Sequence, residues 1–468
     1  MDAPGRHVVP GGAQRVLPRD DVVVDGVDER AVEVEEDRCG GHATFVPDGA
    51  PPPVVRGSRS TGGHVAGRHV TREVAVTGQD VVVVGAGVVG LAAARGLALA
   101  GARVRVVERE VPGAGATRVA AGILTPTDVH EWAGALGALH HRALLAWPGY
   151  AAELAEAAGR PVGWRACGSL RVDPSGDAQD GAWLAATGAA ADALGLPAER
   201  LDGAACADRV PGLVPVAGGL WLPDDGAVDT EQLVVAQTAA AGRAGVTFEH
   251  DEVVALRRSG GRVTGVRLAA AGDLAADAVV VAVGAEAARA SWLPPDDRPA
   301  IEPVAGEAVL AGPPGGADTA PPVTSTVVRT RLGSVAPRDG GRSWLGTSVR
   351  RDGFVRRPRI GEVAALLRRA IALLPRIAEL DVLDVRVGLR PVPLDGRPHV
   401  GPGATPGLFH ATGHGREGIL HAPLVAVALP EAVASGALPD WADTTRPRTG
   451  RPPASGRRAG GPSARGPR

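Results

Sequence analysis

The sequence predicts an α/β protein in which a doubly wound, Rossmann-type domain is assembled from discontinuous segments and joined to an α+β domain with a mainly antiparallel sheet. The first supporting observation is an apolar run, DVVVVGAG at residues 80–87, which leads directly into a glycine-punctuated helical pattern. The second is strand and helix alternation at residues 407–436, near the C-terminal end. The third is a strand-rich middle. A nucleotide-binding domain interrupted by an antiparallel domain accounts for all three.

Each expected element follows from its local pattern. Residues 80–84 and 102–110 have the apolar character of buried parallel strands, and they flank a helix expected over 88–101. Asp229 and Thr230 are cap candidates for a helix over 229–245. Alternation at 382–390 predicts a strand that stops at Pro391. Further helices are expected over 135–159 and 361–374, and further strands over 162–173, 246–250, 252–269 and 277–285 and as several short pieces within 300–350.

Composition excludes several classes of protein. With 468 residues, a formal net charge of −2 and 44% hydrophobic residues, the chain has room for two or three domains and no charge excess that favours nucleic acid. Cys39, Cys167 and Cys206 lack metal-ligand spacing, so we expect no metal. An odd cysteine count, together with no charged-then-apolar leader, favours the reducing cytoplasm. The apolar stretch 81–104 contains Arg95 and is broken by glycines, which argues against a membrane span.

A glycine-rich loop carries the first functional signal. Gly85, Gly87 and Gly90 form a G-x-G-x-x-G pattern between an apolar strand and a helix. The first glycine allows a tight turn, the second lets the backbone approach a pyrophosphate, and the third lets the helix pack on the sheet. Glu108 ends the next strand 18 residues after Gly90, where a carboxylate can hold ribose hydroxyls. The pattern predicts dinucleotide binding; the alternative is a plain turn in a glycine-rich chain.

The loop alone does not distinguish FAD from NAD. The strand at 277–285 ends in a glycine, Gly284, where flavoproteins of this architecture return to the nucleotide. Small residues at 115–126 let the backbone pass close to a flavin ring. Either segment alone is compatible with an ordinary loop. Their order along the chain favours a flavin.

The motifs together resemble the D-amino-acid oxidase superfamily of FAD enzymes, most closely its glycine oxidase branch in thiamine biosynthesis. They are GAGVVG…VVER, ATRVAAGILTP, VVVAVGA, GLRPVPLDGRPHVGP and GLFHATGHGREGILHAP, in this order between Asp80 and Ala437. The resemblance implies FAD as the cofactor and implies its contacts at the matching positions. These are Gly85, Gly87, Val88, Val89, Gly90, Glu108, Arg109, Thr117, Ala121, Gly122, Ile123, Val253, Gly284, His414, Gly415, Arg416, Glu417, Gly418, Ile419 and Leu420.

The resemblance also implies the domain organisation. The FAD-binding domain would comprise residues 78–161, 227–298 and 388–440, and the substrate domain residues 162–226 and 299–387. Residues 1–77 lack a persistent hydrophobic period and are expected to form an irregular or disordered extension. Residues 441–468 are expected to form a disordered, arginine-rich tail.

The segment HGREGIL at 414–420 begins a helix after a glycine turn. The free N–H groups and the positive dipole end of such a helix favour negative charge. By the resemblance this segment lies against the isoalloxazine, where it would raise the electron affinity of the flavin. The alternative is a helix cap without a cofactor role. His414 is interpreted as a packing or flavin-contact residue rather than a base.

Arg390 is an always-charged side chain at the end of an apolar strand. Guanidinium groups bind carboxylates with two parallel hydrogen bonds. By the resemblance, Arg390 binds the α-carboxylate of the substrate, and Arg416 matches a second position near it. The implied reaction is hydride transfer from the substrate Cα to flavin N5, which gives an imine and then an oxo acid, ammonia and hydrogen peroxide. A surface salt bridge is the alternative role for Arg390.

The chain departs from the resemblance at two places. The stretch RLGSVAPR at 331–338 has Gly333 or Ser334 where the related oxidases carry a tyrosine, and HGREG contains Gly415 and Glu417. The expected partners are a small amine or amino acid as the substrate and O2 as the electron acceptor. We expect neither nucleic acid nor a membrane as a partner, and the sequence leaves a homo-oligomer possible. The alternatives are a D-amino-acid or sarcosine-type oxidase or dehydrogenase, and a flavin-binding protein with little catalytic activity.

Overall fold

The computed structural model describes residues 75–126, 136–316 and 320–447. Most of the expected N-terminal extension and most of the expected tail lie outside these ranges. Where the two segments are described, they are ordered. Val76 is fully buried, and its N–H donates to the Ala100 carbonyl. The 3-10 turn Asp440–Thr445 buries Ala442, so the tail differs from the prediction over its first residues.

A six-stranded sheet organises the dinucleotide loop. It is parallel except at one edge, where the first strand in the order below runs antiparallel to its neighbour. The central strand β1 is apolar throughout its buried length, as expected of a parallel sheet covered on both faces. The order is β19 (His399–Pro402), β20 (Leu408–Thr412), β13 (Ala278–Val281), β1 (Asp80–Val84), β2 (Arg103–Glu108) and β9 (Thr247–His250).

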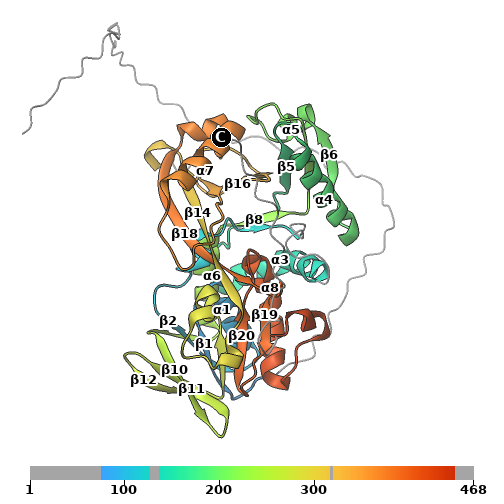
Figure 1. Cartoon of the computed structure of the whole chain (residues 1–468). Helices are drawn as coiled ribbons and strands as arrows, with labels where there is room; N and C mark the ends of the chain where they lie inside the picture. The colour runs from blue at the N-terminus through green and yellow to red at the C-terminus, as the bar shows by residue number, and fades with distance from the viewer. Residues whose placement is uncertain (1–74, 127–135, 317–319, 448–468) are drawn as a thin grey trace, which may run out of the picture. The chain divides into compact units, whose positions relative to one another are not determined.

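Four helices pack beside this sheet or against one another. They are α1 (Val88–Leu99), α3 (Gly137–Ala158), α6 (Thr230–Arg243) and α8 (Gly418–Ser435), and Figure 1 shows α1 and α8 next to β1, β20 and β19. A Cβ on Gly96 of α1 would lie 2.1 Å from the Ala426 carbonyl oxygen of α8, so glycine permits the close crossing. The Asp229 side chain accepts the N–H groups of Glu231 and Gln232, which confirms it as the cap of α6.

Among the described residues, helix α8 is long and apolar enough to cross a membrane, by length and composition, with a mean hydropathy of 1.5. Of its residues, 67% are buried inside the protein. Such burial is also what a core helix shows, so the observation is weak evidence for a membrane. The cytoplasmic location stays a prediction.

An eight-stranded, mostly antiparallel sheet forms the second large layer. Its β5 and β15 pair in parallel, and the other neighbours pair antiparallel. In Figure 1 the strands β14 and β18 run side by side, in agreement with their ladder of paired residues. The order is β18 (Asp381–Pro393), β14 (Ile301–Gly312), β17 (Ser343–Gly346), β16 (Gly333–Pro337), β15 (Val327–Thr330), β5 (Ser169–Asp173), β7 (Gly218–Leu222) and β6 (Glu199–Asp202).

Shorter elements complete the fold. One three-stranded sheet contains β10 (Val253–Ser259), β11 (Arg262–Leu268) and β12 (Gly272–Ala275), and another contains β3 (Ile123–Leu124), β8 (Gly226–Val228) and β4 (Trp164–Arg165). The remaining helices are α2 (Ala116–Val119), α4 (Ala178–Leu194), α5 (Gly203–Arg209) and α7 (Ile360–Leu373), with 3-10 turns at Gly284–Arg289, Pro295–Asp297, Pro314–Gly316 and Pro375–Glu379.

The predicted α/β class with a parallel and a mainly antiparallel sheet is confirmed. Several local expectations differ from the structure. The strands expected over 162–173 and 252–269 are each divided in two, as β4 and β5 and as β10 and β11, and β18 continues through Pro391 to Pro393 because it stays paired with β14. Helix α4 was not predicted, because its Ala- and Gly-rich sequence has little amphipathic pattern. The region 300–350 was expected to hold only short strands, yet β14 has 12 residues. Its length reflects pairing with β18, a partner about 80 residues away.

Candidate active site

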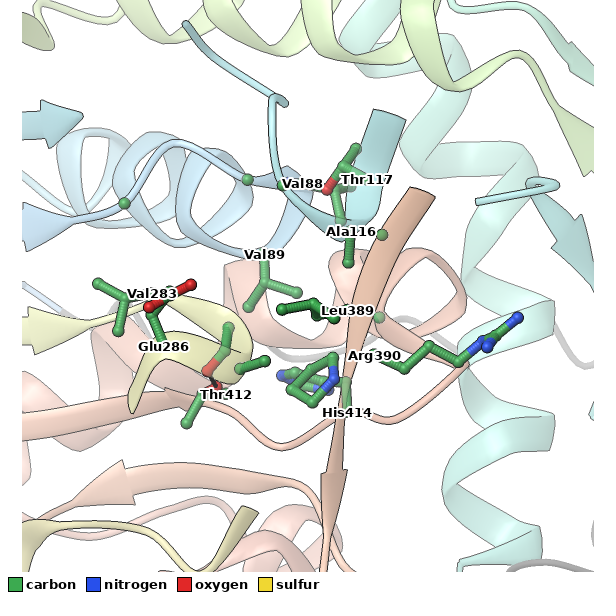
Figure 2. Close-up of a pocket in the computed structure, with 18 of the residues that line it drawn as sticks. Val88, Val89, Ala116, Thr117, Val283, Glu286, Leu389, Arg390, Thr412 and His414 are labelled. Atoms are coloured by element: carbon green, nitrogen blue, oxygen red, sulfur yellow. Dashed lines mark hydrogen bonds between the residues drawn. The ribbon is translucent and has the colours of Figure 1, made fainter. Parts of the chain in front are cut away.

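A cavity of about 540 Å³ lies at the carboxyl ends of the parallel strands. The segments that follow β1, β2, β13 and β20 line one side of it, and residues of the eight-stranded sheet line the other. Figure 2 shows Val88 and Val89, Thr412 and His414, and Leu389 and Arg390 around this pocket. Ligands of open α/β sheets bind at this edge, because the segments that can vary leave the sheet there.

The glycine loop has the shape that a dinucleotide requires. Gly85 has φ +104°, and a Cβ there would lie 2.7 Å from the Ala282 carbonyl oxygen. A Cβ on Gly90 would lie 2.0 Å from the Gly85 carbonyl oxygen. A Cβ on Gly87 would have Thr117 Oγ1 as its nearest neighbour, at 3.5 Å, so this glycine keeps the loop thin on the cavity side. The loop is therefore a cradle that fits the backbone approach of a pyrophosphate.

Polar groups fix the flanks of the loop. The Val88 N–H, at the start of α1, donates to Thr117 Oγ1 at 3.1 Å. The half-buried Glu108 accepts the N–H of Ala86 through Oε2 at 2.8 Å and the N–H of Glu110 through Oε1 at 2.9 Å. Its carboxylate is thereby held at the end of β2, beside the cavity, in the position that the spacing from the glycines predicts for a ribose contact.

Arg109 lies at the rim of the cavity. Its guanidinium forms ion pairs with Glu252 at 3.3 Å and Glu286 at 3.6 Å, and its side chain is 37% exposed. Val253 is buried beside Glu252, and Gly284 accepts a hydrogen bond from Thr412 Oγ1 at 3.0 Å. These residues all line the cavity. They close the end where the loops after β2, β9 and β13 meet.

Ala121, Gly122 and Ile123 also line the cavity. Gly122 has φ +66°, and a Cβ there would lie 2.0 Å from the Val228 carbonyl oxygen. Arg338, from the end of β16, donates to the Ala121 carbonyl at 2.6 Å. Burial lowers the pKa of Arg338 to about 10, and nearby Asp229 opposes that shift. No motif or spacing in the sequence singles out Arg338.

The segment 414–420 is split between the cavity and the core. His414, Gly415, Arg416, Glu417, Gly418 and Ile419 line the cavity, whereas Leu420 does not. Leu420 is buried in the core, and its carbonyl accepts the Trp147 Nε1–H at 3.1 Å. Gly90 also lies outside the cavity lining, since it packs against the Gly85 carbonyl. Both positions support the site from behind.

His414 is a neutral residue in the wall. Its side chain is buried, and its Nδ1 lies 3.1 Å from Nδ1 of His421. Burial lowers the pKa of His414 to about 3, with a smaller effect from His399. One of the two facing nitrogens must carry a hydrogen for this contact to be a hydrogen bond. A neutral His414 is unsuited to supplying positive charge at this wall.

Arg390 projects from β18 and lines the cavity. Its Nη2 donates to Thr347 Oγ1 at 2.7 Å, and its Nη1 donates to the carbonyls of Ser348 at 3.2 Å and Ala305 at 3.3 Å. A Cβ on Gly306 would lie 2.4 Å from Nη1. The guanidinium is therefore held in one plane over Gly306, a residue that no sequence motif indicates.

Ser334 occupies the cavity wall at the stretch where the sequence lacks a tyrosine. It lines the cavity, and its Oγ donates to the Gly346 carbonyl at 3.1 Å, whereas Gly333 does not reach the cavity. Tyr150 lies elsewhere, in the core, where its hydroxyl accepts the Gln237 Nε2–H at 2.9 Å. Burial raises the pKa of Tyr150 to about 12. Arg329 also lines this wall, and its one sequence signal is an arginine inside the apolar strand VVRT.

Within the described ranges, no group of three or more His, Cys, Asp or Glu side chains is arranged to hold a metal ion. The cavity instead combines a dinucleotide cradle with a guanidinium opposite it. This combination is the one expected of an oxidoreductase that uses a dinucleotide cofactor.

The comparison with family models identifies the class more closely. The model of the DAO family, described as FAD dependent oxidoreductase, matches residues 80–431. The chain belongs to this family. FAD is therefore its cofactor, and both the resemblance stated from the motifs and the predicted flavin are confirmed.

Individual relatives agree with this assignment. The chain is 33% identical over 362 residues to the glycine oxidase of Geobacillus kaustophilus, covering 76% of this chain and 92% of that protein. It is 30% identical to the bifunctional protein ThiO/ThiG of a Nostoc species, of which it spans 52%. The crystal structure of the Geobacillus kaustophilus glycine oxidase aligns with a TM-score of 0.68 and 30% identity, covering 76% of this chain and 95% of that one.

Proposed function

We propose that this FAD-dependent oxidoreductase oxidises glycine or another small amine or amino acid to the imine, which water hydrolyses to an oxo acid and ammonia. The observation that carries the proposal is the fixed guanidinium of Arg390 in the cavity that also holds the dinucleotide cradle. The similarity to a glycine oxidase along most of both chains supports an amino acid as the substrate.

The residues around Arg390 favour binding of a carboxylate. Thr347, Ser348 and Ala305 hold the guanidinium by hydrogen bonds, so little side-chain entropy remains to be lost when an anion binds. A carboxylate bound by two hydrogen bonds has a fixed orientation, and with it the Cα–H and amino groups are oriented. Bound FAD supplies the acceptor for the hydride from this carbon. Arg416 is exposed at the same cavity and is proposed as a second contact to the substrate.

The cofactor side of the proposal concerns the residues of the cradle. Gly85, Gly87 and the N-terminus of α1 would hold the pyrophosphate, and Glu108 the ribose. The backbone of Ala121–Ile123 and the segment 414–419 would line the flavin. For this last segment the support is its place in the cavity wall at the start of α8, whose N–H groups favour negative charge.

We further propose O2 as the electron acceptor, with hydrogen peroxide as its product, and a place in the thiazole branch of thiamine biosynthesis. The second proposal is supported by the similarity to ThiO/ThiG proteins.

An anaerobic titration tests the proposal. The purified flavoprotein is mixed in turn with glycine, sarcosine, D-alanine and D-proline, and the long-wavelength flavin absorbance is followed. Bleaching by glycine at low concentration is the expected result. Bleaching by another of these amines but not glycine would move the substrate assignment to that amine. A flavin that none of them bleaches would contradict the proposal and favour a flavin-binding protein with little catalytic activity.

A further inference from the structure

We propose that the cavity contains a second anion-binding subsite, formed by Arg329 and Ser334, and that the preferred substrate is an amino acid with a second carboxylate. The part of this inference that concerns turnover rests on the proposed function. The binding of a second carboxylate is inferred from side chains of the eight-stranded sheet that line the cavity, and it can be tested without turnover.

Arg329 lies on the cavity face of the eight-stranded sheet. It is directly opposite Ser334 in the antiparallel pair β15 and β16, and directly opposite Arg171 in the parallel pair β15 and β5. Residues paired in register point to the same face of a sheet. Arg329 and Ser334 both line the cavity, and Arg329 is 7% exposed. A buried guanidinium is thus placed in the wall of the cavity.

A chain of short contacts connects this subsite to Arg390. Ser334 Oγ donates to the Gly346 carbonyl at 3.1 Å. The next residue, Thr347, accepts from Arg390 Nη2 at 2.7 Å. The wall around these contacts is lined by Gly306, Ser334 and Thr347, all of which have small side chains. A substrate longer than glycine can therefore extend along this wall from Arg390 toward Arg329.

The buried charges next to the subsite favour an anion. Arg171 is fully buried and donates to Thr187 Oγ1 at 3.0 Å and to Thr125 Oγ1 at 2.9 Å. Asp225 is also buried and accepts from Ser169 Oγ at 2.6 Å. Burial raises the pKa of Asp225 to about 6, while Arg171 and, more weakly, Arg329 oppose that shift. Arg171, Arg329 and Ser334 form one row of hydrogen-bond donors across β5, β15 and β16, and two of the three are guanidiniums, which bind carboxylates through charge-assisted hydrogen bonds.

The class of ligand follows from this arrangement. Arg390 would hold the α-carboxylate, and Arg329 with the Ser334 hydroxyl would hold a second carboxylate carried on a short aliphatic spacer. A neutral amide in place of that carboxylate would lose the charge-assisted hydrogen bonds. Aspartate and asparagine have almost the same shape, so this pair isolates the second charge.

The test measures kcat/KM for anaerobic flavin reduction by both enantiomers of aspartate and of asparagine, using the holoenzyme. For the enantiomer that reacts, we expect aspartate to exceed asparagine by roughly 10- to 100-fold, the range for hydrogen bonds to charged groups. In Arg329→Gln this ratio should fall toward one. Arg331→Gln is the matched control, because Arg331 pairs with Asp180 at 3.0 Å, does not line the cavity and should leave the ratio unchanged. Ser334→Tyr, which fills the wall, should lower the ratio independently.

Binding is measured in parallel by the change in the flavin spectrum on adding succinate or butyrate. Tighter binding of succinate, lost in Arg329→Gln or in Ser334→Tyr, supports the subsite even if no amino acid bleaches the flavin, an outcome that would overturn the proposed function alone. Equal wild-type affinities for succinate and butyrate would overturn the subsite. It would also be overturned if Arg329→Gln weakened glycine and aspartate equally, since Arg329 would then serve the same carboxylate as Arg390.

Discussion

Replacing Gly306 by alanine should disable Arg390 without unfolding the protein. The added Cβ would lie 2.4 Å from Nη1, 2.5 Å from Nη2 and 2.7 Å from Cζ of Arg390. These atoms form the far end of a flexible side chain, so the guanidinium can move by about 1 Å and the strands β14 and β18 can keep their register. A misplacement of about 1 Å at a substrate-positioning group can cost roughly 100-fold in rate.

The expected result is a kcat/KM for flavin reduction by the best substrate lowered about 10- to 100-fold, because hydrogen bonds between charged groups contribute about 1.5–3 kcal/mol each. The FAD content and the unfolding temperature should stay close to wild type. Gly333→Ala is the control, since its Cβ would meet no atom closer than 3.5 Å. Wild-type kinetics in Gly306→Ala would refute the assignment of Arg390 to the substrate carboxylate, and loss of the flavin would show that the glycine has a structural role.

Three other predictions test the supports of the site. Arg338→Met removes the hydrogen bond to the Ala121 carbonyl and should weaken FAD binding by about 1.5–3 kcal/mol. Arg338→Lys should recover part of this binding energy. An FAD dissociation constant that fluorescence titration finds unchanged in Arg338→Met would contradict the prediction. Gly122→Ala introduces a Cβ 2.0 Å from the Val228 carbonyl oxygen at φ +66°. The protein should therefore unfold at a lower denaturant concentration, because a backbone oxygen cannot move aside as a side chain can. An unchanged midpoint of denaturant unfolding would show that this segment shifts freely. Burial raises the pKa of Asp225 from 3.8 to about 6, so between these pH values the folded state binds more protons than the unfolded state. The free energy of unfolding should therefore fall by about 3 kcal/mol as the pH rises through this window. Asp225→Asn should remove this pH dependence, and identical pH profiles of urea unfolding for the two proteins would count against the prediction.

The sequence identified the parts of the site that lie close together along the chain. Gly85, Gly87 and Gly90 specify a turn between a strand and a helix, and Glu108 follows at the end of the next strand. Local backbone conformation and strand periodicity are properties of a few successive residues, so the pattern contains them. Asp229 was recognised as a helix cap for the same reason, because its side chain binds N–H groups two and three residues later.

Only the tertiary structure decided which residues meet across strands. Gly306 lies in β14 and Arg390 in the neighbouring strand β18, two positions apart in register, and their contact is set by that pairing. Arg329 faces Ser334 across a turn whose register the sequence leaves open. Arg338 reaches Ala121 over 217 positions of the chain. Leu420 was expected at the cofactor but turns into the core, because the phase of α8 sets which of its residues face the cavity. Such contacts depend on the register and packing of whole elements, which no short stretch of sequence specifies.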